Sequence, residues 1–329
     1  MKAWQVHKQG EPRDVMRLAD VELGDPAPGI LRLRVLSAGV GLPDSLMCRG
    51  SYVLTPELPF TPGQELVGEV TAVGEGCVTK VGAKVLGVSG FHFRAGSFAE
   101  ECFGLDAFAL PVPDGMSDAE AAAFAIPYHT AWVGLVDRGQ LAEGETVLVL
   151  GGSGGTGSTA IQLAKALGAR VIAVAGGEEK VAFCRECGAD EVVDYRAGGI
   201  AEGVRAVTDG RGVDLVYDPV GGDAYTEATK CIAANGRILL IGFASGRWGQ
   251  PSAPHMVAHN YSAVGVMPGA GRTRDDALHA QSVMAEHYRA GRLRVPIHRV
   301  FPFDEAPLAV EEMSSGRIKG KVVVAVGSS

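Results

Sequence analysis

The sequence predicts an α/β protein in which a strand-rich first part is followed by a doubly wound parallel sheet. Up to about residue 115, short apolar runs are separated by Gly and Pro turns, which is typical of short β-strands. After Ser117, strand and helix patterns alternate along the chain, which is typical of βαβ units. With 329 residues, 47% of them apolar and 21% charged, the chain is long enough for two domains and too apolar to be disordered.

The first part contains three clear strand candidates, Leu31–Leu36, Leu66–Val73 and Lys84–Val88. Apolar and polar residues alternate over Gly63–Val70, as expected for a strand with one buried face. Several short strands joined by Gly-rich turns predict a small, partly closed barrel.

The second part begins with a helix signal. Ser117 and Glu120 have the Ser-x-x-Glu spacing of a capping box, and an Ala-rich stretch follows them. Strands and helices are then expected in alternation, in a parallel sheet covered on both faces. The expected strands are Thr146–Leu150, Arg170–Ala175, Glu191–Val193, Val213–Tyr217 and Arg237–Ile241, and the expected helices are Ser158–Leu167 and Glu178–Cys187. Beyond about residue 265 the pattern is irregular, with a helix over Asp275–Ala290 and a last strand over Lys321–Val326.

Charge and cysteine content exclude several kinds of partner. The 30 basic and 38 acidic residues give a net charge of −8, which disfavours a broad nucleic-acid or membrane surface. Six irregularly spaced cysteines do not make a disulfide framework, and no apolar run reaches the roughly 18 residues of a membrane-spanning helix. The first residues lack the apolar core of a signal peptide. We therefore expect a cytoplasmic protein with no nucleic-acid or membrane partner.

A glycine-rich turn is the sharpest functional signal in the sequence. Gly152, Gly154 and Gly157 fit the pattern G-x-G-x-x-G and stand between an apolar strand and a helix. Glycines in this pattern make a tight turn, let the backbone approach a pyrophosphate and let helix and strand pack closely. The helix N-terminus offers free N–H groups to phosphates, and Ser153 and Thr156 can add hydroxyl contacts. The turn predicts a dinucleotide site, whereas a P-loop is excluded because no Gly-Lys-Ser/Thr sequence follows.

The end of the next expected strand indicates which nicotinamide cofactor binds. An NAD enzyme usually has an acidic residue there, but Ala175 stands at that position, followed by Gly176–Gly177. These small residues leave room for a 2′-phosphate, to which Lys180 and Tyr195–Arg196 could supply positive charge and a hydroxyl group. We therefore favour NADP. In the alternative, NAD would bind with Glu178–Glu179 as the acceptor for the ribose hydroxyl.

Short motifs occur in a specific order from one end of the chain to the other. They are Gly39–Asp44, Gly50–Tyr52, Pro59–Gly63, Val73–Gly76, Gly96–Glu100, Thr130–Trp132, Gly154–Gly157, Ile161–Lys165, Tyr217–Gly222 and Gly316–Lys321. In this ordered set the chain resembles the quinone oxidoreductase (zeta-crystallin-like) branch of the zinc-free medium-chain dehydrogenase/reductase superfamily. Two departures are Gly41, where the branch commonly has Asn, and Thr156, where it commonly has Val.

The resemblance implies a GroES-like β-barrel domain formed by residues 1–122 and 265–329, and an inserted Rossmann domain of residues 123–264. It also implies NADPH as cofactor and a homodimer or homotetramer. Residues implied to contact the cofactor are Thr130, Ser153, Gly154, Gly155, Thr156, Gly157, Gly176, Lys180, Tyr195, Ile241, Gly242, Phe243, Ala244 and Arg317. Residues implied to lie near the substrate are Gly41, Leu42, Tyr52 and Tyr128.

Zinc can be tested by position. The alcohol dehydrogenases of this superfamily hold catalytic zinc with a Cys, a His and a later Cys, and this chain has Gly41, Gln64 and Ile126 at those places. None of the three can bind zinc as those side chains do. The four-cysteine loop of the structural zinc site is also missing from the sequence, where only Cys102 lies in that region. We expect no zinc.

An enzyme without zinc has no Lewis acid at this position to polarise a carbonyl group, so its hydride acceptor is expected to be electron-poor already. Quinones and α,β-unsaturated carbonyl compounds meet that condition. The proton would come from solvent or from Tyr52, which matches a functional Tyr in the enoyl thioester reductases of the superfamily. In the alternative interpretations, Tyr52 only shapes the pocket and Tyr128 only packs within a helix.

Two other functions remain open at this point. An enoyl-acyl thioester reductase would share the fold and the cofactor, but it would need a basic entrance for coenzyme A or a carrier protein. A crystallin-like structural or RNA-binding protein that still binds NADPH belongs to a different class. The net charge of −8 gives RNA little electrostatic attraction.

Overall fold

The computed structural model describes residues 1–327, and the chain divides into two compact units. Unit 1 comprises Met1–Ile126, Arg272–Arg289 and Val295–Ser329, of which the part up to residue 327 is described. Unit 2 comprises Pro127–Gly271 and Ala290–Arg294. Unit 1 is therefore built from both ends of the chain, and unit 2 is inserted into it. No helix within the described residues is long and apolar enough to cross a bilayer.

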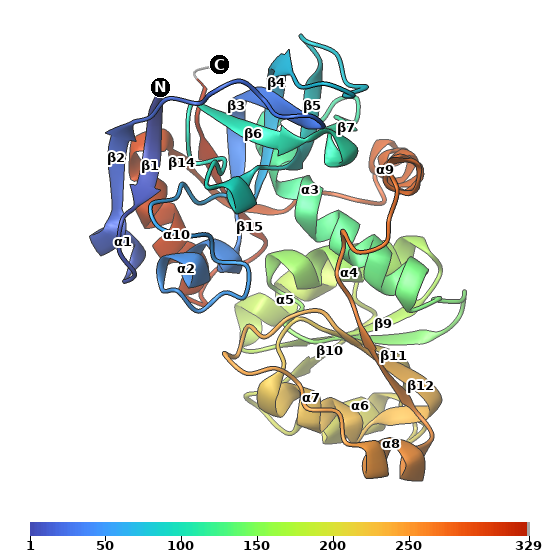
Figure 1. The fold of residues 1–329 in the computed structure, drawn as a ribbon. Coiled ribbons are helices and arrows are strands. Elements are labelled where there is room, and N and C mark those ends of the chain that lie inside the picture. Colours follow the sequence, from blue (N-terminus) through green and yellow to red (C-terminus); the bar gives the residue numbers. More distant parts are fainter. Residues whose placement is uncertain (328–329) are drawn as a thin grey trace. The chain divides into compact units, whose positions relative to one another are not determined.

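Unit 1 is organised around a seven-stranded sheet (Figure 1). Its strands are β3 (Ile30–Val40), β4 (Glu65–Val73), β5 (Lys84–Val88), β6 (Glu101–Leu105), β7 (Leu110–Pro111), β14 (Ile297–Pro302) and β15 (Lys321–Ala325). The strand order is β14-β15-β3-β4-β5-β7, and β6 pairs with β3. A separate antiparallel hairpin is formed by β1 (Lys2–Val6) and β2 (Met16–Asp20).

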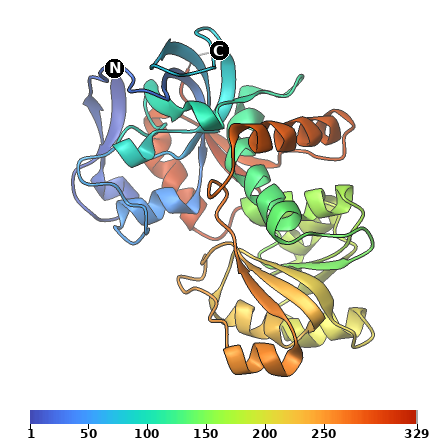
Figure 2. The same ribbon diagram turned by 45° about the vertical axis from the view of Figure 1, so that its right-hand side comes forward.

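Helices and short 3₁₀ turns complete unit 1. The α-helices are α1 (Pro12–Val15), α2 (Leu42–Cys48), α9 (Arg274–Arg289) and α10 (Ala306–Ser314), and the 3₁₀ turns are η1 (Phe91–Phe93), η2 (Asp106–Phe108) and η4 (Phe303–Glu305). The orange-red helix α9 follows the inserted unit in the sequence and returns to unit 1 (Figure 2), where Arg274 donates a hydrogen bond to the carbonyl oxygen of Asp106. The chain thus re-enters unit 1 through a specific polar contact.

The capping box predicted at the start of the second part is confirmed. Helix α3 (Asp118–Trp132) begins there, with the Ser117 backbone N–H donating to Glu120 Oε2 (3.0 Å) and the Glu120 N–H donating to Ser117 Oγ (3.3 Å). These two bonds satisfy donors that a helix start would otherwise leave open. A π-helical turn, η3 (Val133–Arg138), continues directly from α3.

Unit 2 contains a six-stranded sheet in which every pair of neighbours is parallel. Its strands are β8 (Thr146–Val149), β9 (Arg170–Ala175), β10 (Glu191–Asp194), β11 (Val213–Asp218), β12 (Ile232–Leu240) and β13 (Ser262–Gly265). The order β10-β9-β8-β11-β12-β13 is the strand order 3-2-1-4-5-6 of a Rossmann fold. The predicted doubly wound parallel sheet is therefore confirmed.

Five helices follow the strands of unit 2: α4 (Gly155–Ala166), α5 (Glu178–Glu186), α6 (Ile200–Val207), α7 (Gly222–Thr229) and α8 (Ala253–His259). Helices α4 and α5 cover one face of the sheet, and α6 and α7 cover the other (Figure 1). The strands are buried on both faces, and Leu148, Ile172 and Val216 are 0% exposed. Burial on both faces explains why these strands are apolar without alternation.

A buried ion pair joins the two ends of the chain within unit 1. Lys321, the first residue of β15, is 4% exposed and donates from Nζ to Glu65 Oε1 of β4 and to the carbonyl oxygen of Val40 at the end of β3 (2.8 Å). The other oxygen of Glu65 accepts the backbone N–H of Ile126 in α3 (2.9 Å). The pair therefore links β3, β4, β15 and α3.

Lys321→Met should destabilise the protein strongly, because it leaves the buried Glu65 carboxylate without its cation. We expect a loss of about 3 kcal/mol and a fall in melting temperature of about 6–12 °C, measured by calorimetry. The matched control is Lys2→Met, which breaks the exposed Lys2–Asp20 pair and should cost less than about 0.5 kcal/mol. Equal melting temperatures for the two variants would contradict this role for the buried pair.

Candidate functional site

The strand order of unit 2 reverses between β8 and β11, and open α/β sheets bind ligands in the crevice outside the carboxyl ends of the strands at such a point. The glycine-rich turn follows β8 directly. The segment Asp218–Gly222 follows β11 at the same edge of the sheet. The fold therefore brings two glycine-containing chain segments to the expected ligand position.

The glycines of the turn are required for different structural reasons. Gly151 adopts φ +60°, a left-handed conformation that favours glycine, and its carbonyl oxygen accepts the N–H of Gly154 (3.0 Å). A Cβ atom on Gly157 would lie 2.2 Å from that same oxygen, so helix α4 packs against the turn only with glycine there. A Cβ atom on Gly152 would lie within about 3.1 Å of side chains of β9, α4 and α5.

The start of helix α4 is open to a ligand. Gly154 is the N-cap, and a Cβ atom there would meet only the Gly151 carbonyl oxygen, at 3.4 Å. Gly155, Thr156 and Gly157 form the first turn of α4, where the backbone N–H groups have no acceptor inside the helix. A helix N-terminus with free N–H groups and a positive dipole end is suited to a phosphate group. Ser153, beside the turn, is buried.

The predicted phosphate-binding side chains lie together at the end of β9. The Tyr195 ring covers Gly176 so closely that a Cβ atom on Gly176 would lie 2.5 Å from Tyr195 Cζ. The Arg196 guanidinium lies over Gly177, where a Cβ atom would be 3.0 Å from Nη1. Burial and the neighbouring Arg196 charge lower the pKa of Lys180. Lys180 and Arg196 are close enough for their positive charges to interact, and the exposed Tyr195 lies beside Arg196 in the chain. This arrangement suits an anionic group such as a 2′-phosphate.

Asp194 organises this cluster and was not among the residues predicted from the sequence. Its Oδ1 atom accepts the backbone N–H groups of Gly177 (3.1 Å) and Arg196 (2.9 Å), and these bonds lower the pKa of its carboxyl group. Asp194 therefore ties the turn after β9 to the turn after β10. The sequence contained one signal for this role: Asp194 is the last residue of β10 and stands two residues before Arg196.

The predicted segment Ile241–Ala244 lies beside the end of β11. The N–H groups of Ile241 and Gly242 donate to the carbonyl oxygen of Asp218 (3.0 and 3.2 Å), and the Ala244 N–H donates to Pro219 (3.1 Å). The Phe243 ring packs on Trp248, with ring centroids 4.7 Å apart. These bonds place the segment at the switch point with the glycine-rich turn.

In unit 1 the predicted substrate residues surround the start of α2. Gly41 is the N-cap and Leu42 the first residue of α2, and the Gly41 N–H donates to Asp44 Oδ2 (2.8 Å). Asp44 is fully buried, and its Oδ1 accepts the Gly63 N–H (3.0 Å). Burial raises the pKa of the Asp44 carboxyl group to about 7, although both backbone bonds and Lys321 oppose that rise.

Tyr52 lies in the loop after α2 and is half-buried against the core of unit 1. Burial raises the pKa of its hydroxyl group, the nearby Gln64 amide lowers it, and the Asp44 charge raises it. Tyr52, Gln64 and Asp44 are therefore close neighbours, and Tyr52 carries its proton at neutral pH. From the sequence, Gln64 was predicted only to be a residue that cannot bind zinc.

Three other predicted residues lie elsewhere. Tyr128 is fully buried in α3, and its hydroxyl donates to the carbonyl oxygen of Arg294 (2.5 Å), as in the packing alternative. Thr130 is buried further along the same helix. Arg317 is exposed after α10, and its N–H donates to Ser315 Oγ (3.2 Å).

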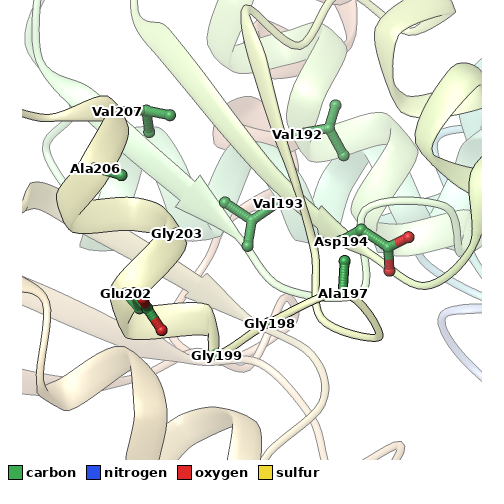
Figure 3. Close-up of a pocket in the computed structure, with 10 residues that line it drawn as sticks. All are labelled: Val192, Val193, Asp194, Ala197, Gly198, Gly199, Glu202, Gly203, Ala206 and Val207. Atoms are coloured by element: carbon green, nitrogen blue, oxygen red, sulfur yellow. The ribbon is translucent and has the colours of Figure 1, made fainter.

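A hollow of about 450 Å³ opens between β10 and α6 (Figure 3). Its lining is mostly small or apolar, and the charged side chains in it are Asp194 and Glu202. Since the Asp194 carboxylate already binds two backbone N–H groups, we assign no ligand to this hollow.

The residues at the superfamily's zinc position do not fit a metal ion. Gly41 has no side chain, Ile126 has a hydrocarbon side chain and Gln64 offers only an amide. Among residues 1–327, no group of three or more His, Cys, Asp or Glu side chains could hold a metal. Cys184 and Cys187 are buried with their pKa values raised to about 12, so their thiols are protonated packing groups.

Comparison with known proteins agrees with the fold of the two units. A family model described as "Alcohol dehydrogenase GroES-like domain" matches residues 27–114, and one described as "Zinc-binding dehydrogenase" matches residues 155–281. The quinone oxidoreductase-like protein 2 homolog of Nematostella vectensis is 38% identical over 299 residues, which is 89% of this chain and 81% of that protein. The solved structure of Escherichia coli quinone oxidoreductase complexed with NADPH has a TM-score of 0.91 at 25% identity, covering 99% of this chain and 100% of that one.

A third relative is much longer. The mycocerosic acid synthase-like polyketide synthase of Mycolicibacterium smegmatis is 32% identical over 321 residues, which is 94% of this chain but 15% of that protein. The two-unit architecture, with a GroES-like domain and a Rossmann domain, is that of a medium-chain dehydrogenase/reductase. Within that superfamily, the chain belongs to the quinone oxidoreductase-like branch.

Gly157→Ala should damage unit 2, because the new methyl group would lie within 2.9 Å of three backbone atoms of Gly151 and Gly152. We expect a loss of about 1–3 kcal/mol, measured as a lower melting temperature. Gly154→Ala is the matched control, since its methyl group meets one atom at 3.4 Å and its φ of −76° suits alanine. If both variants melted like the parent protein, the close approach at Gly157 would be refuted.

Proposed function

We propose that the protein is an NADPH-dependent reductase that transfers hydride to a quinone or an α,β-unsaturated carbonyl compound. The observation that carries the proposal is that Tyr195 lies over Gly176 and Arg196 over Gly177, with Lys180 near enough for the Arg196 charge to act on it. These side chains lie at the edge of the sheet where helix α4 also begins. A cofactor with a 2′-phosphate would use both features, because each phosphate group would meet either cations or free N–H groups. The NADPH in the E. coli relative supports the same assignment.

Unit 2 would bind and orient the cofactor, and unit 1 would contact the acceptor. When bound, NADPH supplies a hydride, which carries two electrons to an electron-poor carbon of the acceptor. Gly151–Gly157 would hold the pyrophosphate, and Lys180 with Arg196 would hold the 2′-phosphate. Tyr52 would supply the proton that completes the reduction, since burial keeps its hydroxyl group protonated. The acceptor must be electron-poor because no zinc ligand set is present among the described residues.

The direct test is to measure oxidation of NADPH and of NADH in parallel with 1,4-benzoquinone, 2-cyclohexen-1-one and crotonyl-CoA. We expect faster turnover with NADPH and activity with the first two acceptors. A clear preference for NADH would overturn the assignment of the 2′-phosphate pocket, and no turnover with any acceptor would overturn the proposed activity.

Lys180→Ala should weaken NADPH binding about tenfold to a hundredfold, because one charge-assisted hydrogen bond contributes about 1.5–3 kcal/mol. NADH, which lacks the 2′-phosphate, should bind the variant as it binds the parent protein. Dissociation constants from fluorescence titration would measure both. Lys230→Ala removes a cation that pairs with Glu227 on α7 and should leave both constants unchanged. An equal loss for NADH and NADPH on Lys180→Ala would contradict a phosphate contact.

A second candidate function is reduction of an enoyl-acyl thioester. It is favoured by the 32% identity to a segment of the mycocerosic acid synthase-like polyketide synthase, since an acid synthase handles acyl groups. The crotonyl-CoA arm of the experiment decides between the two. If kcat/KM for crotonyl-CoA exceeded the values for the quinone and the free enone, the thioester would be the better assignment.

A further inference from the structure

Gln64 carries a buried amide in unit 1 that interacts with the Tyr52 hydroxyl but does not reach it at hydrogen-bonding distance. The side chain is 8% exposed, and its Nε2 atom has no hydrogen-bond acceptor among the described residues. A buried donor that lacks a partner destabilises the folded protein, because it has lost its hydrogen bonds to water. Folded proteins satisfy nearly all such groups, so an orphaned amide beside predicted substrate residues points to a ligand that supplies the acceptor.

The backbone around Gln64 is fixed by four hydrogen bonds from two serines. Ser89 donates from Oγ to the Gly63 carbonyl oxygen (2.6 Å) and from its N–H to the Gln64 carbonyl oxygen (2.9 Å). Ser97 donates from its N–H to Gly63 (2.9 Å) and from Oγ to the carbonyl oxygen of Glu65 (2.9 Å). All three consecutive carbonyl groups are held, so the backbone that carries the Gln64 side chain is fixed before a ligand binds.

The neighbours of Gln64 define what kind of group it would meet. The amide lies near enough to the Tyr52 hydroxyl to lower its pKa, and the charge of the buried Asp44 also acts on Tyr52. A ligand atom beside Gln64 Nε2 would therefore also lie close to a protonated phenol. Both groups donate hydrogen bonds, so the fitting ligand atom is an oxygen that gains negative charge.

We propose that Gln64 is a catalytic residue whose Nε2–H donates a hydrogen bond to the carbonyl oxygen of the hydride acceptor. This inference rests on the proposed reductase function and deepens it. In an enone, the hydride forms a C–H bond at the β-carbon, the electron pair of the C=C bond shifts towards the carbonyl group, and the oxygen becomes an enolate oxygen. Gln64 stabilises that oxygen, and the enolate then takes a proton from Tyr52, which regains one from water.

The test compares Gln64→Leu with the matched control Gln281→Leu. Gln281 is also a buried amide of unit 1, but its Nε2 already donates to the Pro111 carbonyl oxygen (2.8 Å). We expect Gln64→Leu to lower kcat/KM for 2-cyclohexen-1-one about a hundredfold, as loss of one oxyanion donor does elsewhere. The loss with 1,4-benzoquinone, which needs less polarisation, should be about tenfold. Gln281→Leu should lower the melting temperature without changing the ratio of the two acceptors.

A spectroscopic readout separates polarisation from structure. With NADP⁺ bound to prevent turnover, 2-cyclohexen-1-one labelled with ¹³C at the carbonyl is added, and the carbonyl stretch is measured by infrared difference spectroscopy. The stretch should lie at lower wavenumber in the parent protein than in Gln64→Leu, because a hydrogen bond weakens the C=O bond. Gln64→Met, which keeps the side-chain length, is the second variant if Gln64→Leu does not fold.

The outcomes separate this inference from the proposed function. If the parent protein reduced no acceptor, the reductase assignment would fail and the inference with it. If the parent protein were active but a folded, NADPH-binding Gln64 variant matched it with every acceptor, the inference alone would fail. An equal loss for enone and quinone, with an unshifted carbonyl stretch, would assign Gln64 a structural role. The parent protein gives a further test that does not depend on any variant. If the carbonyl stretch of its bound enone lay at the wavenumber of a carbonyl group without a hydrogen bond, the inference would be overturned.

Discussion

The buried ion pair between Lys321 and Glu65 is the interaction on which unit 1 depends. The two residues are 256 positions apart, and their contact is possible only after the chain has completed unit 2 and returned. Because Glu65 also accepts the Ile126 N–H, one carboxylate holds β15 against β4 and anchors α3. Gln64 precedes Glu65 in the chain, so the same pair helps to fix the proposed acceptor contact.

Unit 2 depends on a different constraint, which is the absence of side chains. At Gly157 a methyl group would clash with the backbone, whereas at Gly154 it would meet almost nothing. Gly157 therefore serves packing, and Gly154 leaves the start of α4 with little steric cover, as the proposed phosphate contact requires. Gly176 and Gly177 also serve packing, because the space that a side chain would need there is occupied by Tyr195 and Arg196. The high glycine content of the chain, 46 residues, thus has distinct structural uses in this unit.

Much of unit 2 could be predicted because its signals are local. The expected strand Arg170–Ala175 matches β9 in full, and the glycine turn is a contiguous motif. Helices α6 and α7 have eight residues each and contain glycine, so they lacked a long apolar period. Strand β12 begins at Ile232, whereas the sequence predicted a start at Arg237. The earlier residues were missed because Gly236 interrupts the apolar run. The cluster of Asp44, Tyr52 and Gln64 could not be predicted, since it depends on contacts such as Asp44 with Gly63.

Gly41 and Gln64 are the two positions at which the substrate side of this chain is best compared with the quinone oxidoreductase-like branch. The branch commonly has an amide side chain where Gly41 stands, and a Cβ atom there would meet Pro43 Cδ at 3.2 Å and Asp44 Oδ2 at 3.7 Å. A side chain at position 41 would therefore be crowded by Pro43, while the amide of Gln64 is buried and lacks an acceptor among the described residues. An enzyme without a metal at this position must stabilise negative charge with hydrogen-bond donors. Gln64, fixed by its neighbours Gly63 and Glu65, is the donor that this chain places next to the protonated Tyr52.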